Sequence, residues 1–173
     1  DWEVVTSPVT TDLTYVSIVS SDVAWICGEG GIVLKSTDGG LAWTKCTNVT
    51  GNVDLYAISG RSATHAITGD GSGNIFRTSD GGTTWTKVST NSGSFINVLD
   101  YISPTLAYAQ GDPTSSVWRL LKSTDDGVTW SLATSLAAAS GEAGWNGAYD
   151  RIGTNVWFGT NKTKIYKSTT GFE

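Results

Sequence analysis

Short apolar segments alternate with turns rich in glycine, serine and threonine from one end of the chain to the other. Within the segments, apolar and polar positions also alternate, as in VAWIC at 23–27 and LYAI at 55–58. A period of two is typical of strands that have one buried face. No segment shows a convincing helical period, so the pattern predicts an all-β protein with many tight turns.

One motif recurs along the chain with nearly constant spacing. Four similar segments begin at residues 36, 78, 123 and 168, which corresponds to steps of 42, 45 and 45 positions. Such a period is typical of the four-stranded antiparallel blade of a β-propeller. We therefore predict a propeller of about four blades, as part of a larger ring or as a self-associating unit.

The same order of strands precedes each motif. We predict inner strands at 13–19, 55–59, 96–102 and 145–149, and second strands at 24–28, 64–69, 107–111 and 156–159. Third strands are predicted at 32–35, 75–77, 119–122 and 164–167, and outer strands begin at tryptophans 43, 85 and 130. The chain is thus expected to form one domain or half-propeller over 1–173, with blades at about 6–47, 53–90, 95–134 and 144–173.

The repeated motif, Ser/Thr-x-Asp-x-Gly-x-Thr-Trp, resembles the Asp-box or BNR repeat of sialidases, xyloglucanases, sortilin-type receptors and photosystem assembly factors. We expect its residues to be structural, because a short carboxylate accepts N–H bonds within a turn and a hydroxyl closes the same loop. Glycine suits the strained position, and tryptophan covers the blade. These structural residues are Ser36, Asp38, Gly40 and Trp43, then Thr78, Asp80, Gly82 and Trp85, then Ser123, Asp125, Gly127 and Trp130, and finally Ser168.

The two ends of the chain match each other. The fourth motif stops before its tryptophan, whereas residues 1–5 read as an outer strand without a motif, with Trp2 in the register of the other motif tryptophans. We predict that strand 1–5 completes the blade at 164–173, in the way that propellers close. Four blades closing in one chain, two chains forming an eight-bladed ring, and a section of a longer ring all satisfy this pattern. We favour a section or half-ring that associates with further blades.

Charge and composition limit the partners. The net charge of -5 and the pI of about 4.7 do not fit a nucleic-acid-binding surface, and no apolar run approaches the length of a membrane span. The sequence contains no methionine, so we expect it to begin at a processing or cleavage site or at an artificial boundary. Cys27 and Cys46 are expected on the second and fourth strands of one blade, too far apart for an easy disulfide, and we interpret them as free thiols.

Candidate binding residues lie where the repeats differ most. Asp70, Asp112 and Glu142 follow strand ends in glycine-rich turns, and Trp145 and Arg151 mark the fourth inner strand. They are candidates for a rim or channel site, although turn residues of this kind are ordinarily solvated. The single histidine, His65, lies in a strand pattern and is interpreted as structural. No metal or cofactor motif is present.

Enzymatic readings have weaker support. A sialidase needs an arginine cluster, but the only arginines are Arg61, Arg77, Arg119 and Arg151, and no Arg-Ile-Pro occurs. A xyloglucanase-like mechanism needs two opposed carboxylates, for which Asp112 and Glu142 are the weak catalytic candidates.

Two groups of Asp-box proteins resemble this chain in further sequence segments. Photosystem assembly factors are similar over GEGGIVLKSTDGG at 28–40, although their arginine-rich working surface has no counterpart here. Secreted bacterial propellers are similar at 111–113, 141–144 and 155–161. The resemblance implies a secreted or cell-surface, non-enzymatic module that binds a protein or glycan ligand or assembles through its blade edges. A partial or degenerate glycoside hydrolase is the first alternative, and a structural subunit that polymerises by strand exchange is the second.

Overall fold

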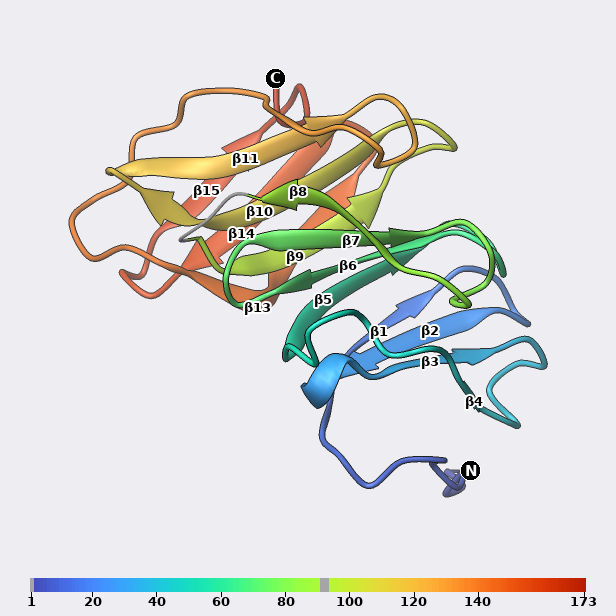
Figure 1. Ribbon diagram of the computed structural model, residues 1–173. Coiled ribbons are helices and arrows are strands. Elements are labelled where there is room, and N and C mark those ends of the chain that lie inside the picture. Colours follow the sequence, from blue (N-terminus) through green and yellow to red (C-terminus); the bar gives the residue numbers. More distant parts are fainter. Residues whose placement is uncertain (1, 91–93) are drawn as a thin grey trace.

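The computed structural model describes residues 2–90 and 94–173, and it confirms an all-β propeller built from consecutive antiparallel blades (Figure 1). Each sheet contains strands in sequence order, from the inner strand of the blade outward. The inner strands of neighbouring blades pack on each other, β1 on β5, β5 on β9 and β9 on β13. The helical content of the described residues is one 3-10 turn, η1 (Glu29–Gly31).

The strand bounds follow the predicted repeats closely. The first blade contains β1 (Leu13–Ile18), β2 (Ala24–Gly28), β3 (Val33–Ser36) and β4 (Thr44–Lys45), and the second contains β5 (Leu55–Gly60), β6 (Ala66–Asp70), β7 (Asn74–Thr78) and β8 (Thr86–Thr90). The third contains β9 (Ile96–Tyr101), β10 (Ala107–Thr114), β11 (Val117–Ser123) and β12 (Ser131–Leu132). The fourth has three strands, β13 (Gly144–Ile152), β14 (Asn155–Thr160) and β15 (Ile165–Ser168).

The outer edge of the fourth blade is not covered by residues 2–5 of the same chain. These residues form no strand, Trp2 is fully exposed, and Figure 1 shows the two termini at opposite ends of the molecule. Residue 1 of the predicted strand lies outside the described residues. The pairing of 1–5 with 164–173 therefore stays a prediction, and this single chain does not contain it.

The first three motifs form the same hydrogen-bonded turn. In the second, the Thr78 hydroxyl donates to Asp80 Oδ1 at 2.8 Å and accepts the Gly82 N–H at 3.0 Å. Asp80 also accepts the N–H and hydroxyl of Thr84, at 2.9 and 2.6 Å. Gly82 has a φ of 86°, in the left-handed region that glycine adopts without strain. These bonds connect the third strand to the outer strand, and they lower the pKa of Asp80 to about 2, Thr84 being the main cause.

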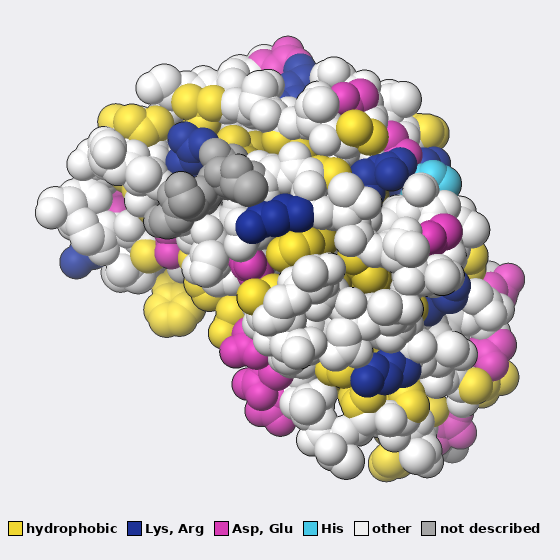
Figure 2. Space-filling view, viewed as in Figure 1, with side chains coloured by type: hydrophobic (Ala, Val, Ile, Leu, Met, Phe, Trp, Pro, Cys, Tyr) yellow, Lys and Arg dark blue, Asp and Glu magenta, His cyan; other side chains and the backbone are white. Residues whose placement is uncertain are grey.

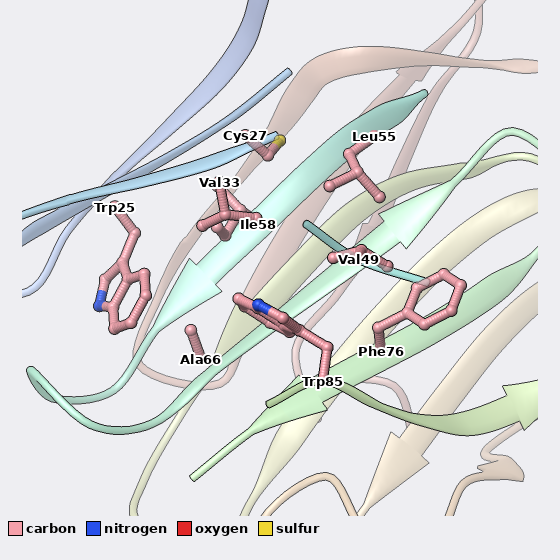
Figure 3. Close-up of a cluster of buried hydrophobic side chains, with 9 residues drawn as sticks. All are labelled: Trp25, Cys27, Val33, Val49, Leu55, Ile58, Ala66, Phe76 and Trp85. Carbon is pink, nitrogen blue, oxygen red and sulfur yellow. The ribbon is translucent and has the colours of Figure 1, made fainter. Parts of the chain in front are cut away.

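A hydrophobic core fills each junction between blades. Figure 3 shows the core between the first two blades, where Trp25, Cys27 and Val33 from the first blade face Leu55 and other apolar residues of the second. Trp25 is fully buried and donates its Nε1–H to the carbonyl of Ser62 at 2.9 Å. At about 25 cal/mol per Å² of buried apolar surface, each junction contributes several kcal/mol to stability.

A basic residue directly before each of the first three motifs joins its blade to the next one. Lys35 Nζ donates to the carbonyl of Gly81 in the second motif at 2.9 Å. Arg77 Nε donates to the carbonyl of Asp126, at the same position of the third motif, at 2.6 Å. Lys122 forms an ion pair with Glu173 at the end of the fourth. The sheets are therefore joined by a repeated polar contact as well as by apolar packing.

Cys27 and Cys46 are both free thiols. Strand β3 separates β2, which carries Cys27, from β4, which Cys46 directly follows. Burial raises the pKa of Cys27 to about 11, so its thiol is un-ionised at neutral pH.

Gly60 tests the close packing of the first junction. A Cβ added there would lie 2.3 Å from Cδ1 of Trp25, so Gly60→Ala must displace the indole. We expect a loss of about 1–3 kcal/mol in the free energy of unfolding, measured by urea denaturation. Gly159→Ala is the matched control, because its Cβ would meet Ala148 at an ordinary 3.7 Å. Equal stability of the two variants would contradict this packing.

Asp80 makes the stability that the second motif contributes depend on pH. Because its pKa is near 2 when folded and about 3.9 when unfolded, its contribution is complete above pH 4 and is lost between about pH 4 and pH 2. The melting temperature of Asp80→Asn should therefore be lower than that of the wild-type protein at pH 7. The difference between the two melting temperatures should become smaller as the pH falls from about 4 to about 2. Melting curves of both proteins from pH 7 to pH 2 test this, and a constant difference would refute the assignment.

Candidate functional site

The four inner strands border one polar hollow of about 340 Å³. Its lining includes Tyr15 from β1, Ser59 from β5, Asp100 from β9, and Tyr149 and Arg151 from β13. Figure 1 shows β5, β9 and β13 following one another through the blade stack, and Figure 2 shows acidic side chains gathered along one edge of the first two blades. Ligand sites of propellers lie around such a channel, so this hollow is the candidate site.

Asp100 is the centre of the polar contacts. Its Oδ2 accepts a hydrogen bond from Arg151 Nε at 2.5 Å and another from the Tyr149 hydroxyl at 3.0 Å. The side chains of Arg151 and Asp100 are 26% and 22% exposed, so the pair is only partly screened by water. Burial, followed by the nearby Asp100 charge, raises the pKa of Tyr149, and this phenol remains a hydrogen-bond donor at neutral pH.

The hollow offers donors and acceptors to a ligand. Among the described residues, Arg151 bonds through Nε alone, so the N–H groups of its two Nη atoms are available for a carbonyl or carboxylate of a ligand. Asp150 accepts the backbone N–H of Arg151 with one oxygen, at 2.8 Å, and its second oxygen is available as an acceptor. Burial raises the pKa of Tyr15 as well, so a further phenol donor is present. The hollow therefore presents both hydrogen-bond donors and acceptors to a ligand.

One repeat position supplies polar side chains from all four blades. The four polar residues that line the hollow at corresponding places on the inner strands are Ser17, Ser59, Asp100 and Asp150. Each lies one position before the residue that pairs with Ala24, Ala66, Ala107 or Val156 of the second strand. The sequence prediction included Arg151 but missed Tyr15, Asp100, Tyr149 and Asp150. The sequence signal that could have identified them is a polar residue at a fixed position of an otherwise apolar inner strand.

Asp70 and Asp112 lie outside the hollow, at the opposite end of the blades from the motifs. Asp70 is buried and accepts the N–H groups of Ser72 and Asn74 at 2.9 and 2.8 Å, which shapes the β6–β7 turn. Asp112 Oδ1 accepts the N–H of Gly144 at 2.8 Å and so links the third blade to the fourth. Both carboxylates therefore hold loops in place.

Glu142 and Trp145 also lie outside the hollow. The side chain of Glu142 is fully buried and accepts bonds from the Ala139 N–H at 2.8 Å and the Tyr166 hydroxyl at 3.0 Å. Burial raises the pKa of Glu142, but these and further hydrogen bonds outweigh it and lower the pKa overall. A carboxylate that is held in this way anchors the connection into the fourth blade. Trp145 is 62% exposed at the start of β13.

A second charged cluster joins the second and third blades on the motif side. Asp126 takes the left-handed conformation, with a φ of 64°, where the first two motifs have glycine. Its carboxylate accepts two bonds from Arg61, at 2.9 and 2.8 Å, and one from Arg77. His65 lies 3.7 Å from the same carboxylate, and its pKa is lowered by burial and by the two arginines. These contacts join the second blade to the third.

Neither a metal cluster nor a membrane-spanning helix occurs among the described residues. No group of three or more His, Cys, Asp and Glu side chains in 2–90 and 94–173 is arranged to hold a metal ion. Over the same ranges, no helix has the length and apolarity needed to cross a membrane.

The fold and the hollow define an Asp-box β-propeller with a polar central site. A model of the family described as photosynthesis system II assembly factor YCF48 matches residues 1–100, more than half of the chain. The chain therefore belongs to this family, which confirms the resemblance that its motifs indicate. No curated protein matches it significantly.

Solved structures share the fold at low sequence identity. A structure of YCF48 bound to D1 peptide has 16% identity and a TM-score of 0.61, over 95% of this chain and 68% of that one. An ancestral GH74 enzyme has 16% identity and a TM-score of 0.70, over 93% of this chain but only 23% of the enzyme. The computationally designed Ika4 protein has 12% identity and a TM-score of 0.64, over 99% of both chains.

The Asp100–Arg151 pair should be measurably coupled. Asp100→Asn and Arg151→Gln each remove one charge and leave the other without its partner. We expect the double variant to be more stable than the sum of the single effects predicts, by about 1 kcal/mol. Urea denaturation of the four proteins gives this coupling energy. Additive effects would show that the pair does not stabilise the hollow.

Proposed function

We propose that the chain is a non-enzymatic assembly module that binds an extended segment of a partner protein in the central hollow. The observation that carries the proposal is the hollow itself, where side chains from four separate blades present donors and acceptors around one space. Membership of the YCF48 family supports it, because a member of that family is known bound to a peptide.

The carboxylates favour binding over hydrolysis. Asp100 receives two donors on one oxygen, which is the geometry of a fixed acceptor and not of an acid that delivers a proton. Glu142 is occupied by several donors within its own loop, and Asp112 holds the backbone of Gly144. The chain also corresponds to only 23% of the ancestral GH74 enzyme, so its likeness to that enzyme supports the fold alone.

Arg151 is the residue that tests this function. The ligands are the D1 peptide and peptides selected on the wild-type protein from a phage-displayed library. Isothermal titration measures how tightly each of them binds. Arg151→Ala removes two Nη groups from the hollow, and we expect it to weaken peptide binding about tenfold or more. The titrations are carried out at fixed salt, because the contact is charged.

Arg61→Ala is the matched control. Arg61 is also a partly buried arginine in an ion pair, with 23% of its side chain exposed, but its partner is Asp126 outside the hollow. Peptide binding should change less than about twofold in this variant. Hydrolysis or tight binding of xyloglucan oligosaccharides, with no selected peptide that depends on Arg151, would overturn the proposal in favour of a glycoside hydrolase.

A further inference from the structure

A groove of about 490 Å³ lies at the other end of β5 from the central hollow, and we call it the rim groove. Tyr56, near the start of β5, and Phe95, directly before β9, give it an aromatic lining. Asp54 and Asp70 give it an acidic lining. None of the described residues lines both the rim groove and the hollow, to which β5 contributes Ser59. The rim groove is therefore a separate site.

The aromatic pair depends on a β-bulge. Tyr56 falls in a register shift of β5 against β6, and such a bulge turns a side chain away from the regular face of the sheet. Its ring packs on the ring of Phe95, with the centroids 4.6 Å apart and an angle of 40° between the planes. At the corresponding shift of β9, Asn97 instead donates a hydrogen bond to Asp112 at 2.8 Å. Both rings are half-buried, so part of each remains open to a ligand.

Gly71 leaves space beside the two rings. A Cβ at this position would lie 3.3 Å from Cε2 of Tyr56 and 3.4 Å from Cδ2 of Phe95, which is closer than most side-chain contacts. Gly73 of the same turn has a φ of 83°, in the left-handed region, whereas the φ of Gly71 lies outside that region. The backbone of the turn therefore does not require glycine at position 71. The absence of a side chain there keeps the aromatic pair accessible.

The rim groove carries negative charge. Its described lining contains two carboxylates and no basic side chain. Asp70 is 1% exposed, and its two oxygens accept bonds only from neutral donors of Ser72 and Asn74 among the described residues. Asp54 is exposed; its Oδ1 accepts the Gly30 N–H at 2.9 Å, and its Oδ2 is available to a ligand. Over 2–90 and 94–173, neither carboxylate forms an ion pair with a lysine or an arginine.

The surface next to the rim groove is acidic as well. The bond from Gly30 places η1 beside Asp54, and η1 begins with the exposed Glu29. The acidic side chains in Figure 2 gather along one edge of the first two blades. An aromatic ring attracts a cation through its face, and a carboxylate attracts it through its charge. The two kinds of lining residue therefore favour the same ligand chemistry.

We propose that the rim groove binds a lysine or arginine side chain of a partner peptide segment. The aliphatic part of that side chain lies on the half-buried rings, and its cationic end reaches Asp54 Oδ2. Arginine is favoured over lysine, because its planar guanidinium stacks on aromatic rings and is more weakly hydrated. A neutral glycan would gain no attraction between charges from the two carboxylates. The proposal holds whatever the central hollow binds.

Chemical-shift titration of the isotope-labelled 173-residue chain tests the proposal. The probes are a capped glycine–serine peptide with one central arginine, and the same peptide with citrulline, which has the shape of arginine without its charge. We expect saturable shifts of the Gly71 and Ser72 amides with the arginine peptide. The citrulline peptide should bind about tenfold more weakly, because the cation–π and carboxylate contacts are lost.

Three outcomes of the titration would overturn the proposal. The first is equal affinity for the two peptides, and the second is a set of shifts confined to the central hollow. The third is that a neutral xyloglucan oligosaccharide shifts the Gly71 and Ser72 amides whereas the arginine peptide does not, which would assign the rim groove to a glycan.

Two variants separate the contributions of charge and ring. Asp54→Asn removes the charge but keeps an oxygen that accepts the Gly30 N–H, and Tyr56→Leu keeps an apolar side chain without the aromatic face. Each should weaken binding of the arginine peptide about fivefold at fixed salt. Circular dichroism verifies that both variants are folded.

Asp12→Asn is the matched control. Asp12 is also exposed and directly precedes an inner strand, β1, but it does not line the rim groove. Its substitution should change the affinity for the arginine peptide less than about twofold. Equal weakening by Asp12→Asn and Asp54→Asn would show a general attraction between an acidic surface and a cation, and would contradict a site in the rim groove.

Discussion

A blade of this propeller has two faces to bury, and each neighbour that covers one of them adds to its stability. The sheets are short, and β4 and β12 contain two residues each, so hydrogen bonding within a blade is limited. Stability therefore comes mainly from the junctions, where Trp25, Val33 and Ile58 are almost fully removed from water. The repeated Asp-box turn, the basic residue before it and the large apolar residues of the second and third strands all serve these junctions.

The blades were predictable because their signals are local. The hydroxyl, carboxylate and glycine of each motif act within one turn of a few residues, so their spacing in the sequence reveals the turn and its neighbouring strands. The outer strands were less predictable, because two-residue strands such as Thr44–Lys45 depend on the edge that they pair with. The three strands of the fourth blade were predictable in the same way, but which strand pairs with the outer edge of β15 depends on an arrangement in space.

The hollow was predicted only at Arg151. Its other main residues, Asp100 and Tyr149, are 51 and 49 positions from their partners in the contacts that form it, and their spacing carries no local pattern. Asp126 is a similar case, because the two arginines that bind it come from another blade. By contrast, Glu142 and Asp112 were conspicuous in glycine-rich loops, where acidic residues often serve the turn itself. A polar residue within an apolar strand was therefore a better predictor of the hollow than an acidic residue in a glycine-rich loop.

The hollow and the junctions are energetically linked, because the residues that line the hollow lie at the inner edges of the blades. A ligand that contacts β1, β9 and β13 at once binds only when these blades are correctly stacked, and so it stabilises the whole arc by mass action. The reverse also holds, because any contact that fixes the end blades reduces the freedom that the ligand must remove. Stacking of the blades and occupation of the hollow are thus expected to favour one another, even though different residues carry the two contacts.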